Sequence, residues 1–194
     1  MGKAPPLPYK KFDELQTGDV LLIAGGWPIT AADNLLSGDK VSDSSHTVSY
    51  LKGVNGKKLF LDNQPGEGPR IISEEVFLEK YGQRGAQVAR LIGQPLNEQE
   101  SKQLFTASVE MAQKNRKEIA NKWFGTNYGT WGKDNVVCSE ADWALLKAAG
   151  REIPKSGDQT KVELGIDFSP ADYRNQQYFL VTPLSMPKQS AKKK

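Results

Sequence analysis

The sequence is poor in the two side chains that most often bind transition metals. Its 194 residues include one cysteine, Cys138, and one histidine, His46. A single cysteine excludes an intramolecular disulfide, and together the two residues give too few ligands for a zinc site of the His/Cys type. The phosphate-binding pattern Gly-x-x-x-x-Gly-Lys and the serine-hydrolase pattern Gly-x-Ser-x-Gly are also absent. We therefore expect neither a metal nor a cofactor.

Long apolar runs are missing as well. No segment approaches the ~18 consecutive apolar residues of a membrane-spanning helix, and the first residues carry no signal-peptide run. We expect no integral membrane segment. We also expect the protein to be synthesised as a soluble cytoplasmic chain, so that it would reach a site outside the cell only by export or injection. The net charge of +3 is not organised into a basic stripe with aromatics, so nucleic acid is not expected as a partner.

The composition fits one compact domain. Hydrophobic residues make up 38% of the chain and charged residues 25%, as in soluble globular proteins. Prolines at the start predict an irregular lead-in over residues 1–11, and a lysine-rich end predicts a basic flexible tail over 185–194. The domain itself is expected to span residues 12–184.

Strands and helices follow one another without a regular βαβ rhythm, which favours an α+β fold with a mostly antiparallel sheet. Short apolar or alternating runs predict strands, and apolar residues at helical spacing with capping residues predict helices. The predicted strands cover 20–24, 46–51, 58–62, 86–92 and 178–181. The predicted helices cover 28–38, 73–81, a long segment opening at Asn97, and 139–149, while 125–135 and 151–175 are expected to be irregular.

Cys138 is the strongest candidate nucleophile. It precedes the predicted helix 139–149, and the unpaired N–H groups and dipole at a helix N-terminus favour the thiolate form of a cysteine. His46 opens a predicted strand, where its imidazole can accept the thiol proton as a general base. Because a lone cysteine and a lone histidine are more often structural, local context has to support this pair.

A third residue is needed to orient the imidazole. Asn55-Gly56 predicts a tight turn between strands 46–51 and 58–62, and a turn centred there places Asp62 opposite Val48. Asp62 is then a diagonal neighbour of His46 on the same face of the hairpin. Asn63 points to the other face and is the second choice for a polar partner of the site.

Three stretches together resemble the permuted branch of the NlpC-type papain-like hydrolases, which includes relatives of lecithin:retinol acyltransferase. They are Leu15-Gln16-Thr17-Gly18-Asp19-Val20-Leu21-Leu22, Ser44-Ser45-His46-Thr47-Val48-Ser49-Tyr50-Leu51 and Val137-Cys138-Ser139-Glu140. The cysteine follows the histidine, as it does in that branch. The resemblance implies a circularly permuted papain-like fold with Cys138 as nucleophile, His46 as base and Asp62 in the third position, where the family usually has Glu or another polar residue.

The resemblance also implies acyl transfer through an acyl-enzyme. The oxyanion would be held by the Cys138 N–H and a second donor, for which Tyr128 is a hypothesis that competes with a packing role. The substrate is expected to be an amide in bacterial cell-wall peptides. Such an enzyme would act on the envelope, as a delivered antibacterial toxin that needs an inhibitory immunity protein. The alternatives are a phospholipase-like acyl-ester hydrolase or acyltransferase and a catalytically silent binding domain.

Overall fold

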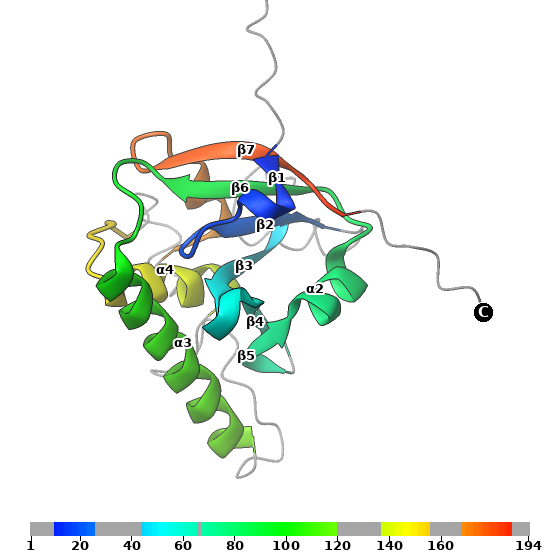
Figure 1. The fold of residues 1–194 in the computed structure, drawn as a ribbon, viewed down its shortest axis with the longest axis vertical. Coiled ribbons are helices and arrows are strands. Elements are labelled where there is room, and N and C mark those ends of the chain that lie inside the picture. Colours follow the sequence, from blue (N-terminus) through cyan, green and yellow to red (C-terminus); the bar gives the residue numbers. More distant parts are fainter. Residues whose placement is uncertain (1–9, 26–43, 66, 120–136, 156–167, 188–194) are drawn as a thin grey trace, which may run out of the picture.

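The computed structural model describes residues 10–25, 44–65, 67–119, 137–155 and 168–187. Within them the chain forms an α+β fold in which a seven-stranded mixed sheet is covered by helices on both faces (Figure 1). The strand order is β1-β7-β6-β2-β3-β4-β5, and only β1 and β7 are parallel. This confirms the expected α+β class and the mostly antiparallel sheet.

Strand β2 lies at the centre of this sheet, and β1 and β5 form its edges. The bounds are β1 Lys10–Lys11, β2 Val20–Ala24, β3 Ser44–Lys52, β4 Lys58–Gln64, β5 Gly68–Ser73, β6 Ala86–Leu91 and β7 Phe179–Ser185. The apolar run Val20 to Ile23 makes β2 a fully buried strand between β3 and β6, as the sequence predicts. Buried on both faces, it has side chains in two separate cores.

Three α-helices lie on the two faces. They are α2 Glu74–Tyr81, α3 Glu98–Ile119 and α4 Cys138–Ala148, and Figure 1 shows α3 and α4 on one side of β3–β5 and α2 on the other. Short 3-10 helices add η1 Phe12–Glu14, η2 Val54–Gly56 and η3 Pro170–Arg174. None of the helices in the described ranges is long and apolar enough to cross a membrane.

The predicted helix ends are confirmed where the structure describes them. At the start of α3 the Asn97 side chain accepts the N–H of Glu100 at 2.9 Å, and the Glu100 carboxylate accepts the N–H of Asn97 at 2.8 Å. Ser73 caps α2 by accepting the N–H of Val76 at 3.3 Å. Gly150 follows α4 with a φ of +81°, a conformation that ends helices and that glycine adopts without strain.

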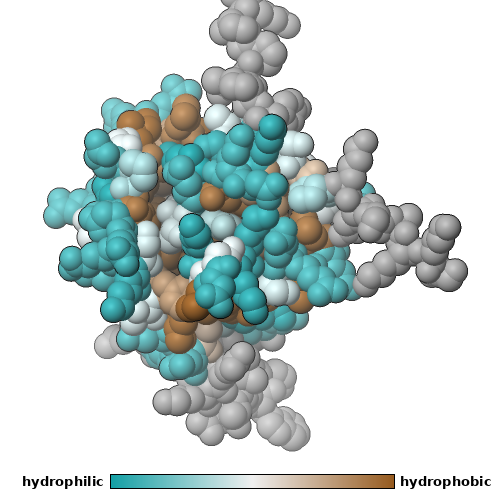
Figure 2. Space-filling view, viewed as in Figure 1, coloured by the Kyte–Doolittle hydropathy of each residue, from teal (hydrophilic) through white to brown (hydrophobic). Residues whose placement is uncertain are grey.

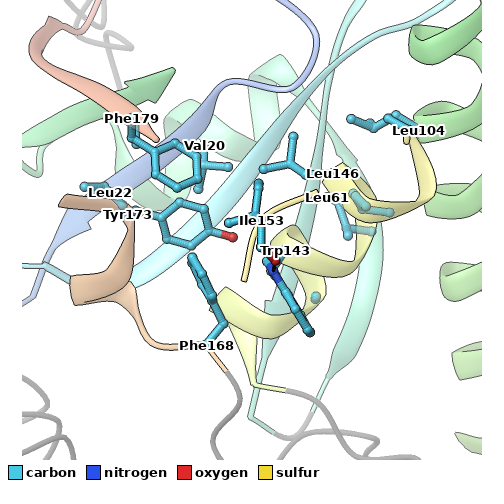
Figure 3. Close-up of a cluster of buried hydrophobic side chains, with 14 of the residues drawn as sticks. Val20, Leu22, Leu61, Leu104, Trp143, Leu146, Ile153, Phe168, Tyr173 and Phe179 are labelled. Atoms are coloured by element: carbon cyan, nitrogen blue, oxygen red, sulfur yellow. Dashed lines mark hydrogen bonds between the residues drawn. The ribbon is translucent and has the colours of Figure 1, made fainter. Parts of the chain in front are cut away.

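The core between the sheet and helices α3 and α4 is rich in aromatic side chains. Figure 3 shows Tyr173 between the rings of Phe168 and Phe179, with centroid separations of 4.8 and 5.0 Å. Trp143 of α4 stacks on Phe168 at 5.8 Å, and its indole N–H donates to the Ile153 carbonyl at 3.0 Å. This packing holds α4 against the sheet.

The other core lies between the sheet and α2. Three phenylalanine rings stack there, those of Phe12, Phe60 and Phe77, and the ring centroids of Phe60 and Phe77 are 4.1 Å apart. On the outside, the face seen in Figure 2 is mainly hydrophilic, and its apolar side chains form separate patches. The two cores therefore account for most of the large apolar residues in the described ranges.

Several sequence predictions need correction. Lys10–Lys11, assigned to the lead-in, forms β1 because it pairs with Leu184 and Ser185 of β7. That pairing also places Ser185, assigned to the tail, inside the sheet. The range 151–175 was expected to be irregular, yet it contains η3, whose Tyr173 is fully buried. The sequence analysis predicted no strand at β5, which pairs with β4 along its whole length. The predicted helix 28–38 and loop 125–135 lie outside the described residues.

Candidate active site

The β3–β4 hairpin brings His46 and Asp62 together. Asn55 and Gly56 take the left-handed φ values of +61° and +74° that reverse the chain, and Val48 pairs with Asp62 as predicted. Asp62 is therefore the diagonal neighbour of His46 on the same face. The imidazole Nε2 donates to Asp62 Oδ1 over 2.8 Å, and both side chains are buried. The predicted partner of the imidazole is confirmed as a contact.

Asp62 is surrounded by donors. Tyr81 of α2 donates its hydroxyl to Oδ1 at 3.0 Å, while Arg70 of β5 and Lys80 of α2 reach Oδ2 at 3.4 Å. Burial pushes the pKa of Asp62 upward, but the bond and charge of His46, with Lys80 and Tyr81, outweigh it and lower the pKa. Asp62 is thus a buried carboxylate that stays ionised.

Cys138 is the first residue of α4. Val137 precedes the helix in an extended conformation, and its N–H is accepted by the Glu140 carboxylate at 3.0 Å. As the first helical residue, Cys138 has a backbone N–H with no acceptor inside the helix. Its side chain is 3% exposed and lies on the stripe of α4 that faces the sheet, with Ala141 and Leu145. The helix therefore presents both the thiol and a backbone donor at one end.

The Cys138 thiol lies close enough to the imidazole to affect its pKa. Since Nε2 is held by Asp62, the second ring nitrogen, Nδ1, is the one left for Cys138. Burial lowers the pKa of His46, but the negative charge of Cys138 and the bond to Asp62 raise it to about 10. With a pKa of about 10, His46 is protonated at neutral pH.

The other two predicted site residues are Asn63 and Tyr128. Asn63 follows Asp62 in β4, so it points to the opposite face of the sheet, where it is 2% exposed. Tyr128 lies outside the described residues. The substrate-binding role of Asn63 and the oxyanion role of Tyr128 stay predictions.

The sequence analysis missed three residues around Asp62. The helical spacing in the sequence indicates that Tyr81 is buried, because it follows Phe77 by one turn. In the structure the two rings are buried together against the sheet. The Tyr81 ring also packs 5.6 Å from the His46 ring. Arg70 lies directly opposite Asp62 in the β4–β5 ladder, and Lys80 precedes Tyr81. Pro69 and the neighbouring glycines conceal β5 in the sequence, because both residue types are rare inside strands.

Comparisons with known proteins bear on the fold alone. No protein-family model matches the chain, and no curated protein matches it. Among solved structures it is similar to metalloprotein yiiX from Escherichia coli O157:H7, DUF1105, with a TM-score of 0.62 and 18% sequence identity. The match covers 89% of this chain and 98% of that one. The two proteins therefore share an overall fold over nearly their whole lengths.

Proposed function

We propose that this protein is a cysteine hydrolase in which Cys138 is the nucleophile, His46 the general acid and base, and Asp62 the residue that orients the imidazole. The observation that carries the proposal is the buried chain of contacts from the thiol through the imidazole to the carboxylate. Nucleophile, base and orienting group in this order are the requirements of acyl transfer by a thiol. The resemblance to permuted NlpC-type hydrolases supports the same assignment.

In the first half-reaction the Cys138 thiolate attacks the carbonyl carbon of the substrate. The C–S bond forms as the carbonyl π electrons move to oxygen, and the tetrahedral intermediate then expels the leaving group. Protonated His46 donates its proton to that leaving amine or alcohol. The products are a thioester on Cys138 and a neutral imidazole, still held by Asp62.

In the second half-reaction His46 takes a proton from water while the water oxygen attacks the thioester carbon. Collapse of this intermediate breaks the C–S bond, releases the carboxylic acid and restores the thiolate–imidazolium pair. The backbone N–H of Cys138 supplies one oxyanion donor, because it points away from the helix end. Tyr128 is our candidate for the other.

For the substrate we propose an amide in bacterial cell-wall peptides, on the strength of the resemblance and the mildly basic chain. The protein would then act as a toxin delivered to the envelope and restrained by an immunity protein. An ester of a membrane lipid is the competing substrate, because the same three residues serve both reactions. The discriminating assays are release of new amine ends from isolated sacculi and release of fatty acid from phospholipid liposomes.

The solved neighbour is named a metalloprotein, so metal binding needs a test against this chain's own residues. Within the described ranges no three His, Cys, Asp or Glu side chains are grouped to hold a metal ion. The single histidine already uses Nε2 to contact Asp62. These residues do not fit a metal centre, and no step of the mechanism is routed through one.

The first experiment measures how fast iodoacetamide alkylates Cys138 from pH 4 to 10. The single thiol gives an unambiguous signal. We expect rapid alkylation well below pH 8.5, the ordinary thiol range, and its loss in His46→Gln, which keeps polarity but cannot carry a charge. Cys138→Ser is the control for both labelling and turnover. An ordinary thiol profile that His46→Gln leaves unchanged contradicts the proposal.

A further inference from the structure

Asp142 is a buried titratable residue that the mechanism above does not use. It lies on α4 one helical turn after Cys138, on the same stripe of the helix, and is 1% exposed. Ser49 of β3 donates its hydroxyl to Asp142 Oδ1 at 2.6 Å. The bond therefore joins the helix that begins with Cys138 to the strand that carries His46.

The second oxygen of this carboxyl has a candidate partner. Asp142 Oδ2 and Thr47 Oγ1 are both buried, and neither makes an aligned hydrogen bond within the described residues. Thr47 and Ser49 share one face of β3, and the Thr47 hydroxyl is close enough to influence the Asp142 carboxyl. Either the Thr47 hydroxyl or a proton on Oδ2 can supply the donor between these two atoms.

We propose that Asp142 is a positioning residue that ties α4 to β3 through Ser49, next to Thr47, and thereby holds Cys138 against His46. The proposal rests on the proposed function of the Cys138–His46 pair and deepens it. Apolar contacts, such as those of Ala141 and Leu145, hold α4 against the sheet. Because such contacts are not directional, they do not fix the translation of the helix along the sheet or its rotation about its own axis. The directional bond from Ser49, one turn from the thiol, supplies that constraint.

The electrostatic surroundings favour the neutral form. Burial raises the pKa of Asp142 to about 7, against the opposing effects of Ser49, Thr47 and His46, and the charge of Asp62 adds to the rise. From η3, Tyr173 also faces this region and donates its hydroxyl to the Ser139 carbonyl at 2.9 Å. No lysine or arginine in the described residues forms an ion pair with Asp142 within 4 Å.

The test uses the single histidine of the full-length protein as a reporter. The His46 imidazole is titrated by NMR in wild type, Asp142→Asn and Asp142→Ala, together with the alkylation rate of Cys138 at pH 6. Asparagine keeps a neutral acceptor and donor of the same shape, whereas alanine removes both. We expect Asp142→Ala to lower the His46 midpoint by about one pH unit or more and alkylation about tenfold, and Asp142→Asn to retain wild-type values.

Ser49→Ala provides the same test if Asp142→Ala does not fold, since it deletes one hydroxyl and leaves the helix intact. It should move the His46 midpoint in the same direction as Asp142→Ala. A purely structural role lowers the melting temperature without moving that midpoint, and this result in a folded variant would overturn the proposal.

Failure of the proposed function has a different signature. If wild-type His46 titrates near its ordinary value of about 6.5, there is no ion pair to position, and both the function and the inference are overturned. If wild type titrates high and neither Asp142→Ala nor Ser49→Ala alters it, the inference alone fails.

Discussion

Two buried aspartates on opposite faces of one sheet have opposite chemical states. Asp62 is 0% exposed and faces α2, and Asp142 is 1% exposed and belongs to α4 on the other face. The pKa of Asp62 is lowered, whereas that of Asp142 is raised to about 7. Equal burial has therefore shifted the two pKa values in opposite directions.

The difference lies in the donors around each carboxyl. Asp62 has an imidazolium, a phenol, a guanidinium and an ammonium within 3.4 Å, whereas the one aligned bond given to Asp142 comes from a neutral hydroxyl. Burial penalises either charge, and only cationic partners repay that penalty. The α2 face is thus built to keep a charge that orients His46, and the α4 face to make a directional link without one.

The largest effect is expected from Asp62→Asn, with Asp142→Asn as its matched control. The first change removes a charge that four donors require, and leaves Arg70 and Lys80 without their buried partner. We expect Cys138 alkylation at pH 6 to fall about 10²- to 10⁴-fold and the free energy of unfolding by about 3–5 kcal/mol. Alkylation kinetics and urea denaturation measure both, and equal losses in the two variants would refute the distinction between the aspartates.

Raising the pH should lower the free energy of unfolding through His46, which lies on the α2 face of the sheet. Its pKa is about 10 in the folded protein against 6.5 for the ordinary group, so its stabilising contribution is complete below pH 6.5 and disappears as pH rises toward 10. The free energy of unfolding should fall by at most about 5 kcal/mol over this range, and by less because the imidazole is coupled to the Cys138 thiol. Urea denaturation at pH 6 and pH 9.5 measures it. His46→Gln should flatten this dependence, and an unchanged slope in the variant contradicts the assignment.

A smaller effect on the same face is expected from Tyr81→Phe. The change deletes one of the hydrogen bonds to the Asp62 carboxylate and leaves the ring packing against His46 and Phe77 in place. A bond to a charged acceptor of this kind contributes about 2 kcal/mol. We expect that loss in urea denaturation, with Cys138 alkylation reduced less than in Asp62→Asn. A loss as large as that of Asp62→Asn would mean that Tyr81, and not the charge, controls the site.

The sequence predicts the local part of this architecture well. The Asn55-Gly56 turn fixes the hairpin register, and the register alone places Asp62 diagonal to His46. The capping residues at Asn97 and the glycine after α4 likewise determine helix ends through short-range bonds. Such features follow from residues a few positions apart, and for that reason the contact between His46 and Asp62 could be predicted from the sequence. Cys138 lies 92 residues after His46, and only the family resemblance placed it with them.

The long-range part is not visible in the same way. Arg70 meets Asp62 only because β5 pairs with β4, and Pro69 hides that strand from an analysis of periodicity. The bond between Ser49 and Asp142 joins residues 93 positions apart, and it depends on how α4 docks on the sheet. The one local signal of Asp142 is that a polar residue lies on the apolar stripe of a helix. This signal does not identify Ser49 as its partner.

The smallest effect, and the sharpest test of the comparison, is that of Asp142→Asn at pH 5. There the wild-type residue is neutral, so the amide replaces it closely and the free energy of unfolding should change by less than about 1 kcal/mol. Because the pKa of Asp142 is raised in the folded state, its stabilising contribution is complete below the ordinary pKa of 3.8 and is lost as pH rises through about 7. At pH 9 the wild type must either bury an ionised carboxylate or keep a proton that the solution pH disfavours, whereas asparagine does neither. The variant should therefore become the more stable protein above pH 7, as urea denaturation from pH 5 to 9 would reveal. If the two curves instead stay parallel with the variant less stable throughout, Asp142 is ionised over this range, and the α4 face holds a charge much as the α2 face does.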